Sequence, residues 1–169
     1  MKLTRASSYA LHAVAYMAQQ KDQTVPVASH HIAKARGIPE RFLLKVLKPL
    51  VSHRVLSSIK GPNGGYRLAK QPSEISMLEI LEAVDGKIQG IAPGAEKSNP
   101  SLNNKLDNIC QECAEAVRKT LKEVTIAQLM PSKKEIAAEE REAASAASEK
   151  DKEKEKAKPK AKPAAKKKD

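Results

Sequence analysis

Hydrophobic positions in the first fifty residues recur every three or four residues, which is the spacing of one face of an α-helix. The pattern predicts three helices, at about residues 4–20, 27–36 and 39–50. The third has the strongest apolar face, formed by Phe42, Leu43, Val46, Leu47 and Leu50. Because Pro49 cannot donate a backbone hydrogen bond inside that helix, we expect a kink or an early end at residues 48–50.

Residues typical of helix ends stand at the boundaries of these segments. Thr4 is a suitable N-cap for the first helix, and Gly37 ends the second because glycine accepts a left-handed backbone. Pro39 occupies the first turn of the third helix, where its missing N–H costs nothing. Two helices joined by a short turn that contains glycine form a helix-turn-helix.

A glycine-rich turn follows the third helix. Apolar and polar residues alternate at 55–59 and 66–69, which predicts two short strands. Between them, Gly61-Pro62-Asn63-Gly64-Gly65 predicts a hairpin turn at positive φ, which glycine and asparagine supply. Lys60 and Arg67 flank the turn. A basic hairpin beside a helix-turn-helix is the wing of a winged helix, which can enter the DNA minor groove or bind phosphates.

The second half of the chain predicts two more helices. Ser76 and Glu79 form a capping box that begins a helix at 76–85, which Gly86 ends. After a loop at 87–101, a long helix spans about 102–124. One row of its residues has the spacing of a coiled-coil seam, which predicts a partner helix from a second copy of the chain. The row comprises Leu106, Cys110, Cys113, Val117, Thr120 and Val124.

The last part of the chain, 132–169, consists mainly of Ala, Glu, Lys, Ser and Pro. It has too few apolar side chains to offset the entropy of ordering the chain, so we expect a disordered tail. Its lysines either attract DNA phosphates without sequence preference or only increase solubility. The expected fold class is therefore mainly α with a small β-hairpin: a winged helix-turn-helix domain at 1–86, a loop at 87–101, a dimerisation helix region at 102–131 and the tail.

Charge is unevenly distributed around a formal net value of +11. Residues 1–70 hold 12 Lys and Arg against two acidic residues, 71–131 hold six against nine, and 132–169 hold 13 against nine, which gives +10, −3 and +4. The basic first half indicates a polyanionic partner, with double-stranded DNA favoured over a membrane surface. No apolar run is long enough to span a membrane and the N-terminus lacks a signal-peptide core, so we expect a cytoplasmic, nucleoid-associated protein.

Four stretches in this order resemble the Rrf2 family of bacterial winged-helix transcription regulators, and the resemblance covers about residues 1–130. They read MKLTRASSYALHAVAYMA, IAKARGIPERFLLKVLKPL, SSIKGPNGGYRLAKQPSEISMLEILEAVDG and VTIAQL. The resemblance implies a homodimer joined through the long helix, with one recognition helix and one wing on each half of a pseudo-palindromic operator. We expect a sequence-specific repressor rather than an activator.

The resemblance also implies which residues contact DNA. Arginine suits guanine and Glu40 can accept a hydrogen bond from the amino group of cytosine. The chain departs from the family at Leu44, where relatives that sense iron–sulfur clusters have a polar residue, and at Arg54, where glycine is usual. The expected DNA-binding residues are Pro39, Glu40, Arg41 and Lys45 on the third helix, Lys60, Asn63 and Arg67 on the wing, and Lys2, Thr4, Arg5, Ser7 and Tyr9 near the N-terminus.

Many family members bind an iron–sulfur cluster through about three cysteines in the loop before the long helix, but the loop of this chain at 87–108 has none. Cys110 and Cys113 lie within the helix instead. We expect them to pack at the dimer seam, where buried cysteine behaves as a small apolar residue, and we expect no cofactor. The alternatives are a thiol switch and a metal or iron–sulfur centre shared between subunits, since C-x2-C is half of a metal site.

Two other functions compete with that of a transcription regulator. An architectural nucleoid protein would bind DNA through its basic tail with little sequence preference. An enzyme is not expected, because no nucleophile–base pair, phosphate loop or complete metal motif is apparent.

Overall fold

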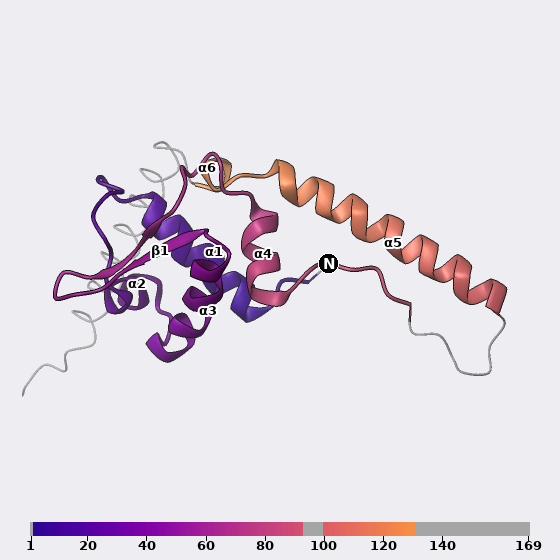
Figure 1. The fold of residues 1–169 in the computed structure, drawn as a ribbon, viewed down its shortest axis with the longest axis horizontal. Helices are drawn as coiled ribbons and strands as arrows, with labels where there is room; N and C mark the ends of the chain where they lie inside the picture. The colour runs from indigo at the N-terminus through magenta and orange to yellow at the C-terminus, as the bar shows by residue number, and fades with distance from the viewer. Residues whose placement is uncertain (1, 93–99, 131–169) are drawn as a thin grey trace, which may run out of the picture. The chain divides into compact units, whose positions relative to one another are not determined.

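The computed structural model of the chain describes residues 2–92 and 100–130 (Figure 1). Within these ranges the fold is mainly helical with one antiparallel hairpin, as predicted. The elements in order are α1 (Arg5–Ala18), α2 (Ser29–Arg36), α3 (Glu40–Ser52), β1 (Leu56–Ile59), β2 (Gly65–Leu68), α4 (Met77–Asp85), α5 (Pro100–Glu123) and α6 (Ile126–Leu129). The predicted disordered tail at 132–169, like residues 93–99 of the predicted loop, lies outside the described residues.

The first helix begins where the sequence predicted. Thr4 caps α1, because its side-chain oxygen accepts a hydrogen bond from the backbone N–H of Ser7 at 3.0 Å. Gly37 ends α2 in the left-handed conformation. Pro39 lies one position earlier than expected, because it is the N-cap of α3 and not a residue of its first turn.

Helix α3 passes through Pro49 and ends three residues later, so the predicted early end is wrong. Proline removes one backbone donor, but the next turn is still closed, since the N–H of His53 donates to the carbonyl of Pro49 at 3.0 Å. The fully buried Leu50 holds this last turn against the core. Arg54 follows with φ of 57°, so a non-glycine residue tolerates the left-handed position at this connection.

The hairpin has a short, regular register from Leu56 opposite Leu68 to Ile59 opposite Gly65. In its turn Gly61 has positive φ and Asn63 does not. In the described ranges, Arg54 is the only non-glycine residue with positive φ. Tyr66 also exchanges backbone hydrogen bonds of 2.8 and 2.9 Å with Val27, the residue that precedes α2.

This pairing ties the wing to the helix-turn-helix and explains why α2 starts later than predicted. The pairing of Tyr66 with Val27 also requires glycine at position 65, since a Cβ there would lie 2.4 Å from the carbonyl oxygen of Val27.

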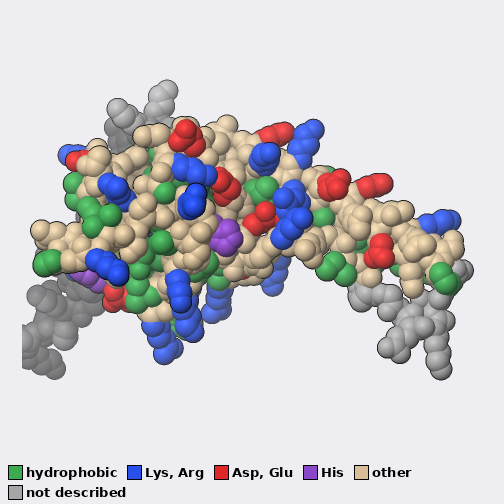
Figure 2. All heavy atoms as spheres, viewed as in Figure 1, with side chains coloured by type: hydrophobic (Ala, Val, Ile, Leu, Met, Phe, Trp, Pro, Cys, Tyr) green, Lys and Arg blue, Asp and Glu red, His purple; other side chains and the backbone are tan. Residues whose placement is uncertain are grey.

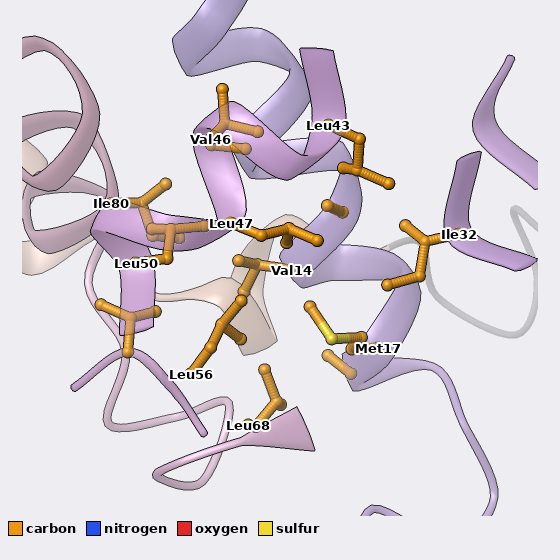
Figure 3. Packing of buried hydrophobic residues seen from close by; sticks show 14 of the residues in the cluster. Val14, Met17, Ile32, Leu43, Val46, Leu47, Leu50, Leu56, Leu68 and Ile80 are labelled. Atoms are coloured by element: carbon orange, nitrogen blue, oxygen red, sulfur yellow. The ribbon is translucent and has the colours of Figure 1, made fainter. Parts of the chain in front are cut away.

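The core is built from the apolar faces that the periodicity predicted, except that Phe42 of the third helix is exposed and lies outside it. Figure 3 shows side chains of α1, α2, α3, α4 and the hairpin pointing toward one another. Helix α1 packs against α2, α3 and α4, and α3 packs against β1. The labelled members of this cluster are Val14, Met17, Ile32, Leu43, Val46, Leu47, Leu50, Leu56, Leu68 and Ile80.

The capping box at the start of α4 is confirmed, with Ser76 and Glu79 bonding each other's backbone N–H groups. Glu79 also accepts a hydrogen bond of 2.6 Å from Lys70. Burial raises the pKa of Glu79, but the hydrogen bonds from Lys70 and Ser76 and the charge of Lys70 outweigh burial and lower its pKa overall.

Helix α5 starts at Pro100 and is exposed over most of its length, with Leu121 as its one buried residue (Figure 1). Its C-terminal end returns to the start of α4: Met77 donates to the carbonyl of Val124 at 2.8 Å, and Ile126 donates to that of Ile75 at 2.9 Å. The sequence did not predict α6, which Thr125 begins with a second capping box.

Candidate nucleic-acid interface

The outward face of α3 carries three cationic side chains in one line. Arg41, Lys45 and Lys48 are exposed and stand four and three residues apart, which places them on the side of α3 opposite its buried residues. Figure 2 shows Lys and Arg side chains gathered at the lower edge of the view, over the position of α3 in Figure 1. We refer to these three residues as the cationic line. None of them forms an ion pair within the described ranges.

Two apolar side chains border the cationic line. Phe42 and Leu44 are 41% and 42% exposed, although every other apolar residue of α3 except Pro49 and Val51 is buried. The guanidinium carbon of Arg41 lies 4.9 Å from the centre of the Phe42 ring, and the ammonium of Lys45 lies 5.7 Å from it. Both distances are within the range of cation–π attraction, which is worth about 0.5–1 kcal/mol at exposed sites.

The start of α3 is attached to α2. Glu40 accepts a hydrogen bond of 2.8 Å from the hydroxyl of Ser29, the first residue of α2. One carboxylate oxygen of Glu40 is therefore engaged, and both Glu40 and Pro39 remain exposed. The four predicted residues of the third helix are thus all exposed.

On the wing, Lys60 and Asn63 are exposed at the tip of the hairpin. Arg67 is half-buried in β2 opposite Ser57, further from the tip. The hairpin therefore presents one cation and one amide at its tip, and a second cation along its side.

The N-terminal residues divide into two groups. Lys2 and Arg5 are exposed, whereas Tyr9 is half-buried against the core and Ser7 is fully buried. The hydroxyl of Ser7 donates to the carboxylate of Asp85, so in this structure it does not offer a group to a phosphate.

Asp85, the last residue of α4, also accepts a hydrogen bond from Thr4, with distances of 2.9 and 3.1 Å from Thr4 Oγ1 to its two oxygens. The sequence pattern did not predict this contact. One feature of the sequence could have indicated it: Asp85 is an acidic residue in the last turn of a helix, where the helix dipole disfavours negative charge and a compensating partner is expected. The carboxylate is stabilised by the N-terminal hydroxyls instead.

On α5, apolar residues form an exposed stripe beside the predicted seam. Cys110, Val117 and Val124 are half-buried, and Val117 packs against the cluster of Leu78, Leu81 and Leu121. The exposed row, which we call the apolar stripe, comprises Leu102, Leu106, Ile109, Cys113, Ala116 and Thr120. Of the predicted seam, Leu106, Cys113 and Thr120 lie on the stripe, and the other three residues are half-buried. Cys113 and the stripe residue Ile109 lie at the edge of the stripe, where they also line a cavity against the rest of the chain.

Both cysteines line one open cavity of about 460 Å³ between α5, the end of α4 and the segment at 86–91. Its walls are mainly apolar, and Lys2 and Asp85 contribute charged groups. Gly90 lies directly against α5 there, since a Cβ on it would be 2.0 Å from the carbonyl oxygen of Cys110.

These residues do not fit an iron–sulfur cluster held by one chain. Such clusters ordinarily take three or four cysteine ligands, and the chain has two. No group of three or more His, Cys, Asp or Glu side chains in the described ranges is arranged to hold a metal ion. The same ranges contain no helix that is both long and apolar enough to cross a membrane.

A sequence profile of the Rrf2 family, described as an iron-dependent transcriptional regulator, matches residues 3–132. A protein of Rhodobacter capsulatus named as an rrf2-like HTH-type transcriptional regulator is 30% identical over 128 residues, 72% of this chain and 80% of that protein. One of Aquifex aeolicus named as an HTH-type transcriptional regulator is 46% identical over 74 residues, 44% of this chain and half of that protein.

Among solved structures, CymR, the global cysteine regulator of B. subtilis, superposes with a TM-score of 0.60 at 25% identity, covering 76% of this chain and 95% of CymR. The winged helix and the exposed α3 are consistent with the family that these similarities indicate. This chain belongs to the Rrf2 family of transcriptional regulators.

Proposed function

We propose that the chain is a homodimeric repressor that binds double-stranded DNA at specific sequences. The observation that carries this proposal is the cationic line on α3, the second helix of a helix-turn-helix. A helix of this kind fits the major groove of B-DNA and places its side chains against base edges. The absence of acidic partners for these cations in the described ranges leaves them available for phosphates and guanines.

The remaining contacts follow from the positions of the wing and the N-terminus. Lys60 and Asn63 at the tip of the hairpin would reach the adjacent minor groove or its phosphates, with Arg67 behind them. Lys2 and Arg5 would contact the backbone next to the recognition helix. Arg41 and Lys45 would read guanines, with Glu40 accepting from a cytosine amino group.

The apolar stripe supports the homodimer. It runs for about five helical turns on a helix that packs against its own chain only along the neighbouring face. Leu102, Leu106 and Ile109 are 52%, 44% and 57% exposed, and such a row is normally covered by another helix. A second α5 of the same chain would bury it and place two α3 helices on successive turns of DNA.

Sedimentation tests the dimer directly. Leu106→Glu and Ile109→Glu should convert the protein to a monomer, because each puts a charge in the centre of an apolar contact. Glu115→Lys, a charge reversal at an exposed position of α5 outside the stripe, is the control and should remain dimeric. Dimers of both stripe variants would refute this interface.

DNA binding is tested by selecting bound duplexes from a random pool and comparing them with random DNA by fluorescence anisotropy. Lys48→Ala should weaken binding and lower the slope of log affinity against log salt by about one, because it removes a phosphate contact. Lys119→Ala on α5 is the matched control and should change neither value. A specific-to-random affinity ratio near one would instead support the architectural alternative.

Repression has its own test, which is transcription in vitro from a promoter that overlaps the selected site. Added protein should lower transcription, and an increase would show an activator. The direction of the change in transcription thus distinguishes a repressor from an activator, which affinity alone does not.

A second candidate function is thiol-based redox sensing, and the cavity shared by Cys110 and Cys113 is the observation that favours it. Residues three apart on a helix face the same side, so an oxidant such as a disulfide reagent can join two such thiols, with the reagent reduced to its two thiols. Oxidation should then change DNA affinity, and Cys110→Ser/Cys113→Ser should abolish the change. Unchanged affinity of the wild-type protein under oxidant would exclude this function.

A further inference from the structure

Two large apolar side chains are exposed on the helix that carries the cationic line. Phe42 and Leu44 each leave about two-fifths of their surface accessible, and neither belongs to the buried core cluster. Single exposed apolar residues are common on protein surfaces. These two lie on the one face of the molecule that the proposed function places against base edges, and this position gives them a specific role.

Their places on the helix are complementary. Successive residues of an α-helix are about 100° apart, so Phe42 lies on one side of the cationic line and Leu44 on the other. The line and its two borders form a surface that is cationic in the middle and apolar at both edges. Figure 2 shows Lys and Arg side chains projecting where α3 lies in this view, with apolar surface beside them.

The cations restrict where the Phe42 ring can lie. Arg41 and Lys45 both lie within cation–π distance of the ring, at 4.9 and 5.7 Å. These contacts favour a ring position beside the two cations, so a cation placed at a guanine brings the ring close to a neighbouring base pair. Leu44 has a short, γ-branched side chain on the other border and would contact the base pair on the opposite side.

The major groove offers one apolar group at its base edges, which is the C5-methyl of thymine. We propose that Phe42 and Leu44 recognise the C5-methyl groups of thymines that flank the base pairs contacted by Arg41 and Lys45. The inference rests on the proposed function and deepens it, because it names the bases beside the cation contacts. Burial of one methyl group should be worth about fourfold in affinity, which is the equivalent of ~0.8 kcal/mol per buried CH₂.

Deoxyuridine provides the test, because it differs from thymidine only by this methyl group. In an operator selected from a random pool, each thymine is replaced singly by deoxyuridine, and dissociation constants are measured by fluorescence anisotropy. At one or two positions of each half-site, the replacement should weaken binding about fourfold. Elsewhere in the operator it should have no effect.

Variants of the protein show which side chain contacts which of the sensitive thymines. Phe42→Ala should bind thymine and deoxyuridine equally at one of these positions, and Leu44→Ala should do so at the other. Lys48→Ala is the matched control: it should bind both operators more weakly and keep the fourfold ratio. Thermal unfolding of each variant checks that it folds, which the exposure of both side chains favours.

The outcomes separate this inference from the proposed function. An operator that is bound specifically, with thymine and deoxyuridine equivalent at every position, overturns the inference alone. A fourfold ratio that persists in both Phe42→Ala and Leu44→Ala does the same. Equal affinity for selected and random duplexes overturns the proposed function and the inference with it.

Discussion

Replacement of Asp85 by alanine should destabilise the domain by about 2 kcal/mol. The carboxylate accepts hydrogen bonds from the hydroxyls of Thr4 and Ser7, which cap and begin α1, and these residues lie 81 and 78 positions away in the sequence. Hydrogen bonds to a charged acceptor contribute about 1.5–3 kcal/mol when they are shielded from water. Thr4 and Asp85 are exposed and their contact is screened, so most of the effect comes from Ser7.

Ser7 determines the magnitude because its side chain is 0% exposed. Without Asp85, its buried hydroxyl keeps the contact with Thr4 Oγ1 at 2.9 Å but loses its hydrogen bond to a charged acceptor, a loss of about 1.5–3 kcal/mol. Ser7→Ala removes that hydroxyl. The double variant should therefore be at least as stable as Asp85→Ala, with a coupling energy of about 1 kcal/mol between the two sites.

Urea unfolding followed by circular dichroism, at one fixed protein concentration, measures all four proteins. Asp85→Ala should lower the midpoint with an unchanged slope, and a loss of about 2 kcal/mol corresponds to ~6–10 °C in Tm for a domain of this size. The reasoning is refuted if Asp85→Ala lies within about 0.5 kcal/mol of wild type, or if the two single effects simply add.

Three further predictions test other parts of the fold. Arg54→Gly should raise stability by about 0.5–1 kcal/mol in urea unfolding, because glycine adopts φ of 57° without strain, whereas Arg54→Ala should give no gain. Glu79→Gln should cost about 0.5–1 kcal/mol at pH 7. Since the folded pKa of Glu79 is lowered from 4.5, its contribution is present above 4.5 and is lost as the pH falls through the lowered folded pKa, so the difference between the two proteins should shrink on acidification; a difference that stays constant as the pH is lowered would contradict the assignment. Gly90→Ala should destabilise by about 1–3 kcal/mol and speed alkylation of Cys110, because its Cβ would displace the segment at 86–91 from α5; unaltered unfolding and alkylation rates would contradict that close contact.

Features set by neighbouring residues were predictable from the sequence. The Thr4 cap, the Ser76 and Glu79 capping box and the left-handed end of α2 at Gly37 each depend on positions within one helical turn. The apolar periodicity of α3 likewise identified its buried residues, although it wrongly included the exposed Phe42. Of the outward cations it indicated Arg41 and Lys45 and missed Lys48.

Features set by distant residues were not predictable in this way. Helix α6 has four residues, too few for a periodic pattern, and it is stabilised by pairing with Ile75 at the start of α4. Asp85 contacts Thr4 and Ser7 only because the fold brings α4 beside α1. On α5, two adjacent rows of residues have the spacing of three and four that predicts a seam. Contact with the rest of the chain determines which row is half-buried and which is exposed.

The return of the chain from α5 to the start of α4 has a consequence for the spacing of the two half-sites in an operator. Ile75 and Met77 on one side, with Val124 and Ile126 on the other, form a short backbone joint between the winged helix and the proposed dimer helix. In a dimer, the separation of the two α3 helices would depend on this joint, and each base pair of DNA adds about 3.4 Å. Substitutions at the joint should therefore change the preferred number of base pairs between half-sites while the sequence read within each half-site stays the same.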